Sequence, residues 1–155
     1  MEELLASRAE AAGYEVSRDG DGVALDGAPI TGFHMLPPEP LLVELSGEPD
    51  DDREGFFGSL GFLCEWVEEA PGFVLGRIVC QLVNEACFAV GEGVGSADDV
   101  DAGMTLGLNH PRGPMAWGEA IGFTHVLETI ESLWVARREE RYRPAPLLQR
   151  LAREP

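Results

Sequence analysis

The chain has 155 residues, of which 45% are hydrophobic, and a formal net charge of −17 at pH 7. All eleven basic residues are arginine. So acidic a chain cannot easily form the positive patch that nucleic-acid phosphates require, and we expect no nucleic-acid partner. No apolar run approaches the roughly 18 residues of a membrane helix and no signal-peptide pattern is visible, so we expect no membrane span and a cytoplasmic location.

The acidic residues are unevenly distributed along the chain. Residues 1–69 contain 17 acidic residues against 3 arginines, a net charge of −14, and residues 70–155 contain 11 against 8, a net charge of −3. We therefore predict two parts, a small α/β unit over residues 1–69 and a helical domain over residues 70–155. The three cysteines, Cys64, Cys80 and Cys87, lack metal-ligand spacing, so we predict small buried thiols and no metal site.

Short β-prone runs separated by turn residues fill the first part. A helix is predicted over residues 2–12 and ends at Gly13, and the Gly-containing link between residues 14–17 and 23–25 predicts a hairpin. The remaining elements predicted here are strands over residues 30–36, 41–45 and 63–67 and a helix over residues 53–60. No glycine-rich phosphate-binding motif follows any of these strands, so the sequence shows no nucleotide-binding site.

The longest apolar helical pattern begins after Pro71 and Gly72 and ends near Gly91. Its apolar residues recur on most of the circumference, which predicts a buried helix. The polar residues Arg77, Asn84 and Glu85 then need partners, and the simplest interpretation is that they tie this helix to neighbouring backbone or to each other.

Further helices are predicted to the end of the chain. Ser96 and Asp99 form a near capping box at the start of one of them. A rigid loop over residues 110–114 separates the first two, and the predicted helices cover residues 100–106, 115–121, 124–137 and 147–152.

The motifs of this second part resemble those of a known family. They are Pro71-Gly72-Phe73-Val74-x-x-Arg77-Ile78, Asn84-Glu85-Ala86, Glu92-Gly93-Val94, Asp98-Asp99-Val100-Asp101, the Gly107–Pro114 loop and Arg141-Tyr142-Arg143-Pro144-x-Pro146-Leu147-Leu148. Together they are similar to the carboxy-terminal domain of 3-hydroxyacyl-CoA dehydrogenases, and most of all to the second, repeated such domain of long bacterial members. The resemblance implies a mainly α fold, a helical dimerisation domain of the 6-phosphogluconate dehydrogenase C-terminal-like type, which in the family supplies the dimer interface and one wall of the acyl-CoA cleft.

A second resemblance lies upstream, in the small α/β unit. In the family, the last strands of the NAD-binding domain carry a catalytic histidine and a glutamate that orients it, and the strands around His34 and Glu44 look like these two. The resemblance implies that His34 takes the hydroxyl proton and that Glu44 holds its imidazole. Arg77, Asn84 and Arg112 are the candidate substrate-binding residues, with Arg112 placed to meet CoA phosphates or, by default, an acidic surface residue.

The sequence departs from the family pattern at two sites. Pro37 stands where the family motif has asparagine, and Gly76 stands where the family has a substrate-contacting asparagine. The cofactor fingerprint is also absent from the sequence, so we expect no cofactor bound by this chain alone, although the family uses NAD. Residues 1–69 are then interpreted as a remnant of a Rossmann-type domain.

Three functions are open on these grounds. The leading hypothesis is a dimeric acyl-CoA-binding or interaction module that lacks autonomous dehydrogenase activity. The alternative is a part of an active NAD-dependent 3-hydroxyacyl-CoA dehydrogenase of fatty-acid or aromatic-acid degradation whose NAD-binding half comes from a partner chain. A third is an unrelated hydrolytic or isomerising use of His34 and Glu44 on acyl-CoA.

Overall fold

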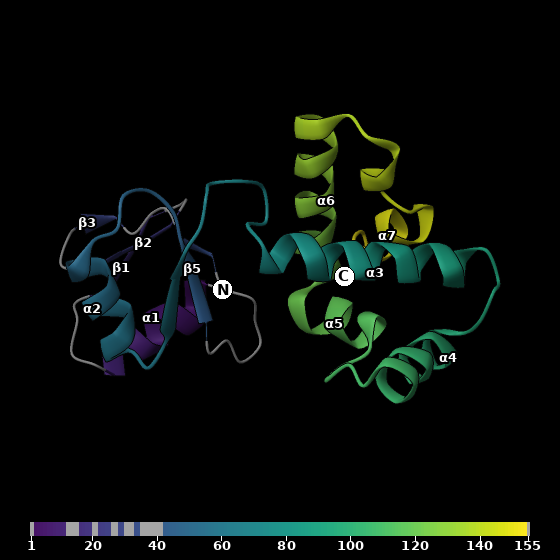
Figure 1. The fold of residues 1–155 in the computed structure, drawn as a ribbon, viewed down its shortest axis with the longest axis horizontal. Helices are drawn as coiled ribbons and strands as arrows, with labels where there is room; N and C mark the ends of the chain where they lie inside the picture. The colour runs from purple at the N-terminus through teal and green to yellow at the C-terminus, as the bar shows by residue number, and fades with distance from the viewer. Residues whose placement is uncertain are drawn as a thin grey trace. The chain divides into compact units, whose positions relative to one another are not determined.

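The computed structural model describes residues 2–11, 16–19, 22–25, 28–29, 33–34 and 42–154. The chain divides into two compact units, Met1–Phe73 and Val74–Pro155 (Figure 1). Several predicted features lie outside the described residues, namely Gly13, the first residues of the hairpin at 14–15, Pro37, and the strand residues 30–32 and 35–36.

The described residues of the first unit form two small sheets and two helices. Helix α1 spans Glu2–Ala11, and the strands β1 (Val16–Asp19), β2 (Gly22–Leu25) and β3 (Ala28–Pro29) form an antiparallel sheet in that order. The β1–β2 pairing sets Val16 opposite Leu25, which confirms the predicted hairpin.

The second sheet contains β4 (Phe33–His34), β5 (Leu42–Leu45) and β6 (Leu63–Trp66) in that order, with β4 antiparallel and β6 parallel to β5. Helix α2 (Asp51–Ser59) connects the parallel pair, so β5, α2 and β6 form a βαβ unit. It begins two residues before the predicted start because the Asp50 side chain accepts a hydrogen bond from the Asp52 backbone N–H at 2.9 Å. The interior of this unit includes Val43, Leu45 and Phe57.

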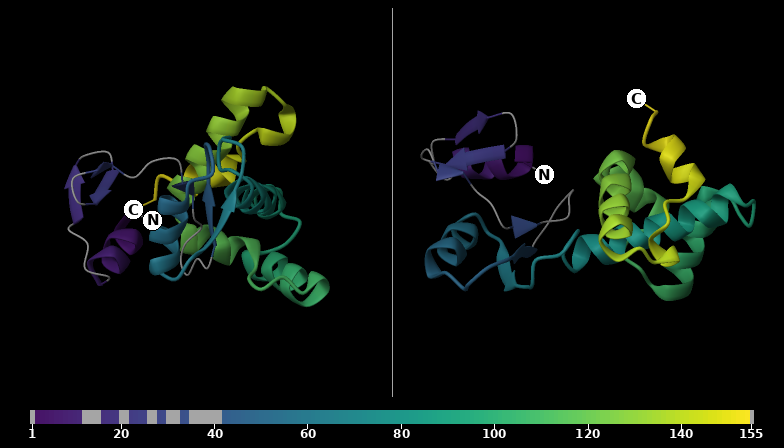
Figure 2. Two further views of the ribbon diagram at one scale, coloured as in Figure 1. Left: turned by 60° about the vertical axis from the view of Figure 1, so that its left-hand side comes forward. Right: turned by 90° about the horizontal axis from the view of Figure 1, so that it is seen from above.

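The second unit is mainly α-helical and is organised around α3 (Leu75–Gly91). Gly72 and Phe73 adopt positive φ angles of 70° and 47° and turn the chain into this helix, as the Pro71–Gly72 pair predicted. Figure 1 shows α3 crossed by α5 (Pro114–Ile121) and α6 (Phe123–Arg137), and Figure 2 gives two further views. The last helix, α7 (Pro146–Leu151), also packs against α3.

One face of α3 lies in a continuous hydrophobic core. The fully buried apolar residues of this core come from α3, α6 and the segment that contains α7, and they are Cys80, Val83, Cys87, Val126, Ile130, Leu133, Ala145 and Leu148. The prediction of a helix buried on most of its circumference is wrong for the first two turns, where Val74 is 47% and Ile78 54% exposed. The other helices cover only part of the circumference of α3, so an apolar stripe remains on its surface.

The segment between α3 and α5 is more irregular than the sequence predicted. Helix α4 (Ala97–Ala102) begins with the predicted capping box, in which Ser96 and Asp99 exchange side chain to backbone hydrogen bonds. The chain then widens into a π-helical turn, Gly103–Gly107, where a plain α-helix to residue 106 was expected. A short 3₁₀ turn, Glu140–Tyr142, also lies between α6 and α7.

Candidate functional site

The two predicted catalytic residues lie on neighbouring strands of the first unit. The antiparallel register of β4 and β5 pairs His34 with Glu44 directly across the ladder. Glu44 is only 2% exposed, and its two neighbours on β5, Val43 and Leu45, are apolar and fully buried. Directly opposed residues in an antiparallel pair are the closest cross-strand neighbours that a sheet offers. The backbone therefore brings these two positions together.

Arg77 lies on α3, and its side chain contacts Tyr142 in the segment before α7. Its guanidinium group donates a hydrogen bond to the Tyr142 hydroxyl, and its Cζ lies 5.3 Å from the centre of the Tyr142 ring. Arg141 approaches the same ring, with its Cζ at 5.0 Å. Tyr142 is only 3% exposed, so the hydrogen bond satisfies a hydroxyl group that would otherwise be buried without a partner. Arg77 thus joins α3 to the segment before α7.

Asn84 is fully buried on α3, and both groups of its amide are engaged. Its Nδ2 donates to the Arg143 carbonyl oxygen at 3.0 Å, and its Oδ1 accepts from the Ala145 backbone N–H at 2.8 Å. These bonds close the loop that leads into α7. The interpretation that the polar residues of this helix tie it to neighbouring backbone is therefore confirmed for Asn84.

Arg112 lies apart from these residues, in the loop before α5. Its Cζ is 5.0 Å from the centre of the Trp117 ring, and the side chain is partly buried. The structure therefore does not bring Arg77, Asn84 and Arg112 into one cluster. Gly76, at the position where the family has asparagine, is buried at the start of α3.

The loop that carries Arg112 is held by Asp101 of α4. Its two carboxylate oxygens accept hydrogen bonds from the Met115 and Ala116 backbone N–H groups, at 2.7 and 2.9 Å, and so cap the first turn of α5. Gly113 is required beside it, because a Cβ there would overlap the Asp101 carboxylate.

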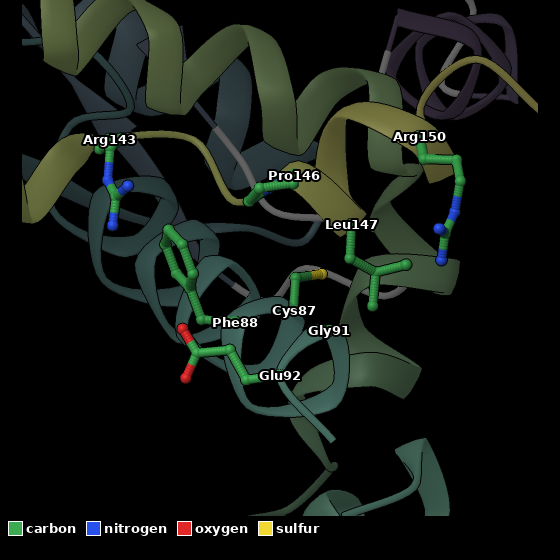
Figure 3. Close-up of a pocket in the computed structure, with 8 residues that line it drawn as sticks. All are labelled: Cys87, Phe88, Gly91, Glu92, Arg143, Pro146, Leu147 and Arg150. Atoms are coloured by element: carbon green, nitrogen blue, oxygen red, sulfur yellow. The ribbon is translucent and has the colours of Figure 1, made fainter. Parts of the chain in front are cut away.

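Two of the hollows in the helical unit are lined in part by arginine side chains. The first, of about 350 Å³, lies beside the exposed stripe of α3 and is lined by Arg77, Ile78, Gln81, Leu82, Glu85, Arg141 and Tyr142. The second, of about 280 Å³, lies between α3 and α7 (Figure 3). Neither hollow was predicted from the sequence, although the Arg141-Tyr142-Arg143 motif contributes to the walls of both.

The cysteines and His125 have perturbed proton affinities. Burial raises the pKa of the Cys80 thiol to about 11, against a smaller opposing effect of a hydrogen bond with Thr129, and burial raises the pKa of Cys87 to about 11. Burial lowers the pKa of His125, whose Nε2 has no hydrogen-bond partner among the described residues. All three cysteines are free thiols; Cys80 and Cys87 are buried as predicted, and Cys64 is partly exposed.

The described part of the chain contains neither a cluster of metal ligands nor a membrane-spanning helix. No group of three potential metal ligands among histidine, cysteine, aspartate and glutamate occurs there. None of the described helices has both the length and the hydropathy needed to cross a bilayer.

The fold of the second unit is that of a helical dehydrogenase domain, because a family model described as 3-hydroxyacyl-CoA dehydrogenase, C-terminal domain, matches residues 72–155. The chain therefore belongs to the 3-hydroxyacyl-CoA dehydrogenase family. This finding confirms the resemblance and the mainly α fold class inferred from the sequence motifs.

Individual relatives extend the likeness beyond the helical unit. The chain is 42% identical over 86 residues to 3-hydroxyadipyl-CoA dehydrogenase of Escherichia coli K12, covering 56% of this chain and 18% of that protein. It is 37% identical over 125 residues to 3-hydroxybutyryl-CoA dehydrogenase of Bradyrhizobium diazoefficiens, covering 76% of this chain and 43% of that protein. The crystal structure of 3-hydroxybutyryl-CoA dehydrogenase from E. coli K12 matches with a TM-score of 0.73 and 28% identity, covering 89% of this chain and 34% of that one. The chain thus spans less than half the length of these relatives.

Proposed function

We propose that this chain is a dimeric acyl-CoA-binding or interaction module of the 3-hydroxyacyl-CoA dehydrogenase type that binds no NAD by itself. The observation that carries the proposal is the exposed stripe of α3, where Val74 and Ile78 leave apolar surface in contact with solvent next to the 350 Å³ hollow. Apolar surface of this kind marks an interaction site. Arg77 and Arg141 line the same hollow and bring positive charge to it, as the phosphates of a CoA ester require, and Arg141 also forms an exposed ion pair with Glu139 at 2.6 Å.

Light scattering and calorimetry test this proposal. The chain should be a dimer over a wide concentration range, and Ile78→Arg should convert it to a monomer because it places a charge in the apolar stripe. Val135→Arg is the matched control, since Val135 is equally exposed, at 60%, on α6. Titration with acetoacetyl-CoA should give a binding isotherm, and titration with NADH should give none. A micromolar NADH isotherm would contradict the proposal.

A second candidate rests on the pairing of His34 with Glu44. This register supports an active role, in which the chain forms part of an NAD-dependent 3-hydroxyacyl-CoA dehydrogenase and the nucleotide-binding half comes from another chain. His34 would remove the proton of the substrate hydroxyl group, and the Glu44 carboxylate would hold the imidazole in the required tautomer.

The assay for this candidate is the oxidation of 3-hydroxybutyryl-CoA, followed by NADH absorbance, with and without a co-purifying protein that contains a Rossmann domain. Activity should require both proteins. His34→Ala should abolish the rate, whereas Glu44→Gln, which keeps the shape of the side chain, should lower it and shift its pH profile. Absence of activity with every such partner would exclude the candidate.

A further inference from the structure

The second hollow of the helical unit combines a positive rim with an apolar floor. Its walls come from two elements, the last turns of α3 and the segment that contains α7. Figure 3 shows Arg143 and Arg150 on opposite sides of a group of apolar side chains that includes Cys87, Phe88 and Leu147. The volume of about 280 Å³ is at the lower end of the range for small-molecule sites.

Arg150 is the strongest candidate for binding an anion. Its side chain is exposed at the edge of the hollow, and it makes no ion pair with any residue that the structure describes. Unlike the exposed Arg137 of α6, it lies in the lining of a hollow. Its planar donors match the two oxygens of a carboxylate.

Arg143 is held more firmly than Arg150. Its Cζ lies 5.0 Å from the centre of the Phe88 ring, and its Nε is 3.9 Å from Glu140 Oε2 in an exposed pair that contributes little energy. It therefore adds positive charge near the apolar floor. Glu92, on the opposite wall, is the one acid in the lining.

We propose that this hollow is a binding site for small organic carboxylates with an apolar tail, whose carboxylate is bound by Arg150 and whose tail lies over Phe88, Pro146 and Leu147. The ligand needs an apolar tail because the floor of the hollow offers no hydrogen bonds to a polar group. The ligand should carry only one negative charge, because the Glu92 carboxylate would repel a second anionic group on the side of the hollow away from Arg150. The site is distinct from the hollow beside the exposed stripe of α3, since the two linings share no residue.

Ligand-observed NMR, protein-observed amide NMR and calorimetry with hexanoate test this site on the full chain. Hexanoate should bind saturably, acetate should bind at least about tenfold more weakly because it has no tail, and hexylamine should not bind. Hexanoate should also shift the backbone amide signals of Gly91 and Leu147. Arg150→Gln should weaken hexanoate binding about tenfold, since a charge-assisted hydrogen bond to a carboxylate is lost.

Arg137→Gln is the matched control, because Arg137 is also an exposed helical arginine but lies outside the hollow. Equal affinities for the two variants would overturn the proposal, as would the absence of saturable hexanoate binding at millimolar concentration. Tighter binding of CoA than of hexanoate, lost in Arg150→Gln, would assign the site to phosphate and overturn the carboxylate assignment. None of these outcomes depends on the dimer or on acyl-CoA binding at α3.

Discussion

Asn84 should contribute more to the stability of the helical unit than any other single polar side chain of α3. Replacing it with alanine removes two hydrogen bonds, to the Arg143 carbonyl and from the Ala145 N–H. The Ala145 N–H is buried and would lose its partner, at a cost of about 1–3 kcal/mol, whereas the Arg143 carbonyl is partly exposed and can bind water, at a cost of about 0.5–1 kcal/mol. We therefore expect Asn84→Ala to lower the free energy of unfolding by about 1.5–4 kcal/mol.

Circular dichroism at 222 nm during urea and thermal unfolding measures this loss. A change of that size should lower the melting temperature by roughly 6–30 °C in a helical unit of this length. Glu85→Gln is the matched control, because Glu85 is the next residue of α3, is exposed, and should change stability by less than about 0.5 kcal/mol.

Asn84→Asp gives a second test of the same geometry. A protonated aspartic acid can donate to the Arg143 carbonyl, but an ionised one cannot and would be buried. Burial would raise its pKa in the folded protein, so this variant should be most stable at low pH and lose stability as pH rises through that raised value. If Asn84→Ala were no less stable than Glu85→Gln, the two hydrogen bonds would have no role in holding the α7 segment.

Three further predictions concern the same unit. Asp101→Ala should lower the free energy of unfolding by about 1–2 kcal/mol, because the first backbone N–H groups of α5 lose their acceptors. Gly113→Ala should be destabilising alone and should stay destabilising in the Asp101→Ala background, because residue 101 keeps a Cβ that lies 2.4 Å from the added methyl group, and an unchanged melting temperature in Gly113→Ala would contradict the overlap. Gly118→Ala should cost about 1–3 kcal/mol by overpacking, since its Cβ would overlap a phenylalanine ring, and an unchanged melting temperature would contradict this. Because burial raises the pKa of Cys80 and Cys87 to about 11, the folded state keeps protons that the unfolded state releases above pH 9. Stability should therefore be full below pH 9 and fall between pH 9 and 11, and replacing both residues with alanine should flatten that slope. A slope unchanged by the double replacement would show that other groups cause it.

The sequence predicted local features well where the signal lies within a few residues. The Ser96 and Asp99 capping box and the β1–β2 hairpin are examples, because each depends on residues that are close neighbours in the chain. The need of Asn84 for a backbone partner also followed from its place among apolar residues. Its actual partners lie 59 and 61 residues away, and no periodicity could have identified them.

Features set by tertiary packing were not predictable in this way. The apolar pattern of α3 could not show that Val74 and Ile78 remain exposed, because that depends on how much of α3 the other helices cover. The π-helical turn at Gly103–Gly107 has no distinctive residue pattern. Of the candidate sites, the direct pairing of His34 with Glu44 depends on the register between two strands, which the pattern of residues along one strand does not specify.

The dependence of α3 on the last residues of the chain also has a consequence for synthesis. Tyr142, Ala145 and Leu148 supply part of the core against which α3 packs, but they follow the end of this helix by about 50 residues. At typical ribosomal rates of about 5–20 residues per second, these residues would be synthesised several seconds after α3. During that interval its apolar face is open to solvent and to other nascent chains. The helical unit should therefore fold only after synthesis of the α7 segment, and its yield in cells should depend on chaperones that cover α3 during that time.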